Sequence, residues 1–115
     1  MPSFEDLRMK ELDDICKTLP KDERYRLRDQ IERASSSVCD NIVEGYGAYY
    51  YNDKIKRMMV ARKEAVETQN HIRKLEVKKY ITIEKADNLI EQYQSVIKGI
   101  NGFVGYIRKK RGDKK

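Results

Sequence analysis

The sequence is poor in the residues that interrupt helices or cross-link small folds. Its 115 residues include no Trp, two Pro, two Cys and one His. So little Pro is compatible with long helices, because Pro removes a backbone donor from a helix interior. Cys16 and Cys39 have neither the spacing of a metal site nor that of a redox pair. We therefore interpret both as small apolar core residues.

The chain also lacks a long hydrophobic run. No segment approaches the roughly 20 uncharged apolar residues that span a bilayer. The first residues, MPSFEDLRMKELDD, are acidic where a secretory signal would be basic and then apolar. We expect a cytoplasmic protein that is neither exported nor bound to a membrane.

Positive charge is scarce in the first half and concentrated in the second. Residues 1–51 carry 8 basic and 11 acidic side chains, whereas residues 52–115 carry 17 basic and 8 acidic ones, a net charge of +9. Such asymmetry suggests a polyanionic partner, although a solvated Lys-rich face with no partner is the commoner explanation.

Apolar residues recur at three- and four-residue steps in four segments, which predicts four amphipathic helices. The first covers about residues 3–18, and Ser3 with Asp6 can form a capping-box-like start. Leu19-Pro20 predicts the first corner, because Pro suits the first turn of a helix.

The second helix is predicted over about residues 20–46, with Gly45 and Gly47 marking its end. Asn52-Asp53 then supplies a cap for a third helix over about residues 53–79. Arg62 and Gln69 fall near the apolar stripe of this helix, so we expect it to be less buried than the others or to bury polar groups against a partner subunit.

The fourth helix begins at Thr82 and has the most regular apolar stripe. Gly99, Gly102 and Gly105 lie beside this stripe, where we expect them to allow close contact between helices. The last residues, KKRGDKK, contain no apolar side chain, and residues 111–115 are predicted to be a disordered basic tail. Residues 1–110 are thus predicted to form one domain, an antiparallel up-down-up-down bundle of four helices.

The segment RASSSVCDNIVEGYG, residues 33–47, resembles small bacterial proteins encoded in intervening sequences of 23S ribosomal RNA genes. The matching residues are Arg33, Ala34, Ser37, Val38, Asn41, Ile42, Glu44, Gly45, Tyr46 and Gly47. Glu67 and the segment Tyr80-Ile81-Thr82 also fit, so the resemblance extends over about residues 4–110. It implies a four-helix bundle that assembles into a homopentamer, with a basic surface and no established enzymatic activity.

The residues themselves do not form a recognisable catalytic constellation. His71 is the only histidine, and neither Cys lies in a nucleophile motif. Glu64, Glu67 and His71 could approach one metal, but a di-iron bundle needs Glu-x-x-His motifs on two helices. We expect no enzymatic activity, no metal and no other cofactor.

Three polar motif residues, Asn41, Glu44 and Glu67, lie on helices whose other faces pack. We interpret them as a partly buried network, with Arg33, that sets helix register or a subunit contact; ligand binding is the alternative.

A tyrosine cluster, comprising Tyr46, Tyr49, Tyr50 and Tyr51, directly precedes several cations. Aromatic rings beside cations can stack on unpaired bases. The same rings could fill a subunit interface, where Tyr is enriched. Both interpretations remain open at this stage.

The leading hypothesis is an oligomer that binds nucleic acid, most plausibly RNA, without reading its sequence. The candidate phosphate contacts are Lys54, Lys56, Arg57, Arg62, Lys63, Arg73, Lys74, Arg108, Lys109, Lys110 and Arg111. In a homo-oligomer each weak contact is repeated, which raises avidity. The alternative hypothesis is an assembly scaffold that binds proteins and has no nucleic-acid role.

Overall fold

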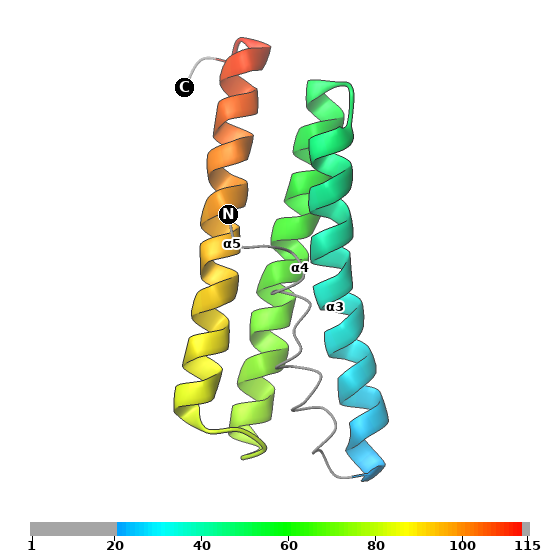
Figure 1. Ribbon diagram of the computed structural model, residues 1–115, viewed down its shortest axis with the longest axis vertical. Coiled ribbons are helices and arrows are strands. Elements are labelled where there is room, and N and C mark those ends of the chain that lie inside the picture. The colour runs from blue at the N-terminus through cyan, green and yellow to red at the C-terminus, as the bar shows by residue number, and fades with distance from the viewer. Residues whose placement is uncertain (1–20, 114–115) are drawn as a thin grey trace.

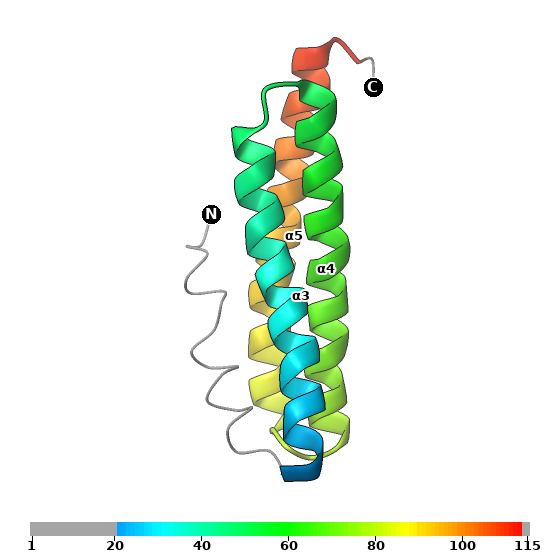
Figure 2. The ribbon, with the colours of Figure 1, turned by 90° about the vertical axis from the view of Figure 1, so that its right-hand side faces the viewer.

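A computed structural model describes the backbone of residues 21–113 and the side chains of residues 25–113. Three long helices make up most of this range: α3 (Lys21–Gly47), α4 (Tyr51–Val77) and α5 (Ile83–Arg111). Each runs antiparallel to the next, with α4 in the middle, as Figures 1 and 2 show. No strand occurs in the described residues, so the expected all-helical class is confirmed.

The prediction of a four-helix, up-down-up-down bundle is wrong: the described residues, 21–113, form three helices. Residues 21–113 contain three apolar stripes, one for each observed helix, and the two connections between them are too short to hold another. The helix expected over residues 3–18 and the corner at Leu19-Pro20 lie outside the described residues.

The core combines one apolar stripe from each helix, because side chains three and four residues apart share a helix face. The core residues of α3 and α5 belong to the apolar stripes predicted for these two helices. Tyr93 of α5 is the largest fully buried side chain. The buried apolar residues of these two helices are Leu27, Ile31, Ala34, Val38, Cys39, Ile42, Ala86, Leu89, Tyr93, Val96, Ile97, Ile100, Val104 and Ile107.

Helix α4 has the weakest stripe in sequence, yet it is the central helix. It packs against both α3 and α5, which make little direct contact with each other. Ala61 and Ala65 are fully buried, so both neighbours can approach closely, and the polar Gln69 reaches α5. Its Nε2 donates to the carbonyl oxygen of Ile90 at 3.1 Å. In line with the expected lower burial, α4 has six buried residues against eight in α5. Its polar Gln69 contacts another helix of the same chain.

Local signals at the helix ends agree with the structure in part. Thr82 caps α5, its side chain accepting a hydrogen bond from the Lys85 amide at 3.1 Å. Helix α4 begins two residues before the expected start, with Tyr50 at the N-cap and no side-chain cap. Gly112 ends α5 in the left-handed conformation that favours glycine (φ 93°). Helix α5 therefore extends through Lys109 and Lys110 to Arg111, the first residue of the predicted tail.

Gly47 ends α3 as predicted, whereas Gly45, Gly102 and Gly105 have surroundings that differ from those predicted. Gly45 lies inside α3, buried against α4, where an added Cβ would be 3.0 Å from Met58 Cε and 3.2 Å from its Cγ. At Gly102 and Gly105 a Cβ would meet nothing within 4 Å in the described part of the chain. These two glycines therefore do not serve helix contact within residues 21–113.

Candidate nucleic-acid interface

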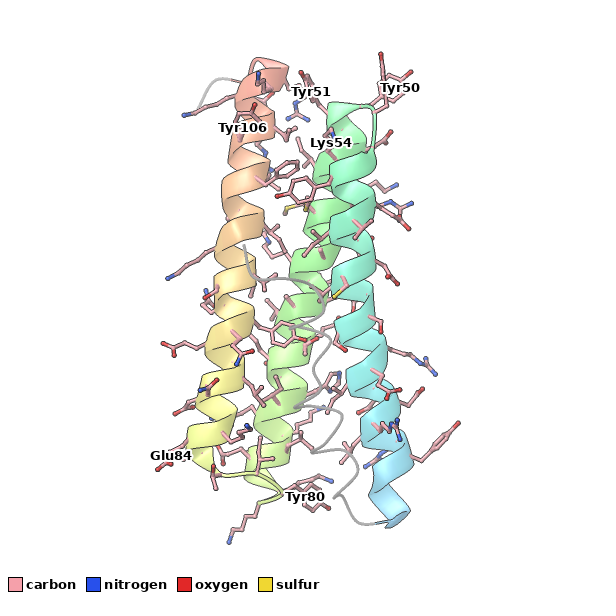
Figure 3. The ribbon with its side chains drawn as sticks, viewed as in Figure 1. Tyr50, Tyr51, Lys54, Tyr80, Glu84 and Tyr106 are labelled. Carbon is pink, nitrogen blue, oxygen red and sulfur yellow. The ribbon has the colours of Figure 1, made fainter. Side chains whose placement is uncertain are left out.

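The antiparallel arrangement brings the start of α4 and the end of α5 to the same end of the molecule (Figure 3). A hydrogen bond links them, with Arg111 Nη1 donating to Asn52 Oδ1 at 2.7 Å. Seven of the eleven candidate phosphate contacts lie here, and we call them the basic end: Lys54, Lys56, Arg57, Arg108, Lys109, Lys110 and Arg111.

Three cations of the basic end already have partners in the fold. Arg57 Nη1 lies 3.1 Å from a carboxylate oxygen of Glu44, joining α4 to α3. Lys54 Nζ donates to the Tyr46 carbonyl oxygen at 2.7 Å, which satisfies an acceptor in the last turn of α3. The guanidinium of Arg111 pairs with Asp113, and hydrogen bonding to Asp113 raises the pKa of Arg111. These three residues stabilise the end of the bundle.

Of the other four cations of the basic end, Arg108 interacts electrostatically with the Asp113 carboxylate, whereas Lys56, Lys109 and Lys110 form no ion pair within residues 25–113. Lys56, Arg108 and Lys109 are exposed, as is Lys110, whose ammonium lies 5.5 Å from the centre of the Tyr106 ring. Their attraction to the negative C-terminal end of α5 helps to hold three of them in place. This part of the surface therefore presents positive charge that is available to an anion.

Several tyrosines lie at the same end of the molecule, and Figure 3 labels three of them, Tyr50, Tyr51 and Tyr106. Tyr49 is 87% and Tyr50 67% exposed, and their rings make an edge-to-face pair with centroids 5.0 Å apart. Tyr46 packs against Phe103 of α5 at 4.6 Å, and Tyr51 is 41% exposed. The tyrosine cluster thus divides into one ring packed on α5 and rings that face solvent.

The remaining four candidate contacts lie elsewhere. Arg62 donates to Asn101 Oδ1 at 2.9 Å, midway along the bundle. Arg73 bridges Glu76 at 3.0 Å and Asp87 at 2.9 Å near the opposite end. Lys63 and Lys74 are exposed. Because a helix rises about 1.5 Å per residue, Lys54 and Arg73 are roughly 28 Å apart along α4. The eleven residues do not form one patch, and Arg62 and Arg73 hold α4 to α5.

Four polar motif residues, Arg33, Ser37, Asn41 and Glu67, line one groove, whereas Glu44 is not among its lining residues. Asn41 is buried, and its Nδ2 donates to the Ser37 carbonyl at 2.8 Å and to Ser37 Oγ at 3.1 Å. Exposed Arg33 pairs with Asp29 one turn away at 2.9 Å. Ile42 belongs to the core, and Gly47 is the last residue of α3. Each polar group is satisfied locally or across α3 and α4.

The groove that Glu67 shares with Arg33 and Asn41 lies between α3 and α4. This open groove has a volume of about 670 Å³, and its lining includes Asn41, Glu64, Glu67 and His71. Burial and the neighbouring Glu67 raise the pKa of Glu64, whereas burial and Lys74 lower that of His71. No group of three or more His, Cys, Asp or Glu side chains in the described residues could hold a metal ion.

The sequence analysis did not predict the contacts that Tyr106 and Asn52 make with the basic end. Tyr106 and Asn52 connect the cations to the fold, through Lys110 and Arg111. The spacing of four residues between Tyr106 and Lys110 on one helix could have indicated the first contact. The second joins residues 59 positions apart and required the tertiary structure.

These features define an all-helical protein in which one group of exposed cations and aromatic rings lies at one end of the described residues, with further exposed lysines elsewhere on the surface. A model of the 23S rRNA-intervening sequence protein family matches residues 6–102, and the chain belongs to this family. No curated protein and no solved structure matches the chain. Among the described helices, none has the length and apolar character needed to cross a membrane.

Proposed function

We propose that this chain is a non-catalytic protein that binds nucleic acid, RNA in the first place, through the basic end. The observation that carries this proposal is the group of three exposed lysines that form no ion pair in the described residues, Lys56, Lys109 and Lys110, with exposed Arg108 on the same helix as two of them. They lie on α4 and α5. The hydrogen bond between Arg111 and Asn52 joins these two helices, and the ion pair between Arg57 and Glu44 joins α4 to α3. The description of the family names ribosomal RNA, which favours RNA as the first ligand to test.

Binding at this end is expected to involve backbone phosphates and not base edges. Lysine ammonium groups are compact point charges, and contacts to phosphate position a protein without reading sequence. Affinity should therefore vary little among sequences and fall with salt, with a log–log slope of about −0.7 for each phosphate neutralised on a single strand.

Three neutral substitutions test the proposal. Lys56→Gln, Lys109→Gln and Lys110→Gln together remove three charges without adding a carboxylate at the end of α5, where it would destabilise the helix. Gel shift with RNA at low salt should show weaker binding to every sequence, and the salt slope should become shallower by about 2.

A matched control removes the same charge elsewhere. Lys63→Gln, Lys74→Gln and Lys98→Gln change exposed lysines on α4 and α5 outside the basic end. This control should retain most of the affinity and the original slope. Equal losses in both triple variants would refute a localised site, and wild-type protein that binds neither RNA nor DNA at low salt would refute the function.

A second proposal, self-association with a scaffolding role, is favoured by exposed apolar side chains. One inward stripe cannot absorb all the apolar residues near the start of α4, and Val60 and Tyr51 indeed remain exposed while Met58 is buried. Covering such groups usually requires another surface. We propose a closed homo-oligomer, a pentamer by resemblance to the family. A light-scattering mass of 13.6 kDa at every concentration would refute it.

A further inference from the structure

Tyr49 and Tyr50 occupy the turn that joins α3 to α4, at the same end as the exposed cations (Figure 3). They are among the most exposed aromatic side chains of the described chain, at 87% and 67%. An edge-to-face pair covers at most one of its four ring faces, so flat apolar surface remains open to a ligand.

The turn that carries these rings is short and held at both sides. The Ala48 amide donates to the Glu44 carbonyl at 2.9 Å, and the Lys54 amide donates to the Tyr50 carbonyl at 3.1 Å. Lys54 Nζ adds a contact across the turn to the Tyr46 carbonyl. The rings are thus presented by an ordered backbone, which lowers the entropy lost when a ligand binds.

Two other rings at this end are engaged, and Tyr51 is less exposed than Tyr49 and Tyr50, at 41%. Tyr46 packs against Phe103, and the Tyr106 ring is in contact with the Lys110 ammonium. Tyr49 and Tyr50 are therefore the most exposed rings at this end of the described chain, which leaves their faces open to a flat ligand.

We propose that the turn between α3 and α4 makes the basic end selective for single-stranded nucleic acid, with Tyr49 and Tyr50 stacking on unpaired bases while Lys56, Lys109 and Lys110 contact phosphates. In a duplex the bases are already stacked and paired, so a duplex can use only the phosphate contacts. This inference rests on the proposed function, since it assigns the ligand class of the same site.

The first measurement compares fluorescein-labelled oligouridylate with an RNA duplex of equal length, by fluorescence anisotropy at one salt concentration. The double variant Tyr49→Leu/Tyr50→Leu should bind oligouridylate at least about five-fold more weakly than wild type, because base–aromatic stacking is lost. Its affinity for the duplex should be unchanged. Tyr49→Phe/Tyr50→Phe keeps both rings and should retain binding to the single strand.

Tyr25 provides a matched control. It is 84% exposed on α3, and the roughly 31 Å of helix between residues 25 and 46 place it at the opposite end. Tyr25→Leu should bind both RNAs as wild type does.

Intrinsic fluorescence gives an independent readout, because the chain has eight Tyr and no Trp to mask their emission. Oligouridylate should quench the emission of wild type, and the double Phe variant should bind with less quenching. Light-scattering masses of all variants should equal that of wild type.

The results separate this inference from the function on which it rests. Equal single-strand affinity for the double Leu variant and wild type, with weaker binding after neutralisation of Lys56, Lys109 and Lys110, would overturn the stacking inference and leave the function standing. A changed mass of the double Leu variant would assign the rings to an interface and overturn it as well. Wild-type protein that binds neither RNA would refute both.

Discussion

Replacing glycine by alanine is expected to destabilise the protein at Gly45 and to stabilise it at Gly102, because only Gly45 is in close contact with another helix of the described chain. Alanine is favoured over glycine in a helix by up to about 1 kcal/mol, so Gly→Ala within α5 should stabilise the protein where space is open. At Gly102 nothing in the described chain lies within 4 Å of the added Cβ. We expect Gly102→Ala to raise the free energy of unfolding by about 0.5–1 kcal/mol.

At Gly45 the same gain opposes a steric cost. The added Cβ would be 3.0 and 3.2 Å from two carbons of Met58, which is fully buried and has little room to move. Overpacking a core costs about 1–3 kcal/mol, so Gly45→Ala should lower the free energy of unfolding by about 1 kcal/mol. For a chain of this size, that corresponds to about 4–8 °C in Tm.

Urea denaturation followed by far-ultraviolet circular dichroism, at one protein concentration, measures both effects. The two variants should differ by about 2 kcal/mol. The variant Met58→Ala removes the side chain that the new Cβ meets, so Gly45→Ala should become neutral or stabilising in that background, a coupling of about 1–2 kcal/mol. If Gly45→Ala stabilises wild type as much as Gly102→Ala does, α3 and α4 are not in tight contact at this position.

Three further predictions follow from local contacts. Glu44→Ala should lower the free energy of unfolding by less than about 1 kcal/mol, because its ion pair with Arg57 is exposed; a larger loss in chemical denaturation would contradict this. Since the pKa of Glu64 is raised by burial and by Glu67, its contribution to stability falls as pH rises above about 4.5. Glu64→Gln should therefore stabilise the protein at pH 7 but not at pH 4, and equal effects at both pH values would refute the assignment. Lys79 has a φ of 63°, so Lys79→Gly should raise Tm in a thermal melt, whereas a lower Tm would show that its side chain compensates for the backbone strain.

The sequence determined the features that depend on neighbours along the chain. Helix periodicity, the buried stripes of α3 and α5, the Thr82 cap and the excess of cations after residue 52 all follow from residues within a few turns of one another. The family resemblance was also readable, because its motif is one continuous segment, and the match over residues 6–102 confirms the family.

Tertiary structure decided which of these local features act together. Antiparallel packing placed Asn52 beside Arg111 and divided the candidate cations between the two ends and the middle of the bundle. It also made α4 central despite its weak stripe, because small buried residues and cross-helix hydrogen bonds hold it between two neighbours. A one-dimensional pattern shows which face of a helix is apolar, but the partner of each polar side chain depends on which helix packs against that face.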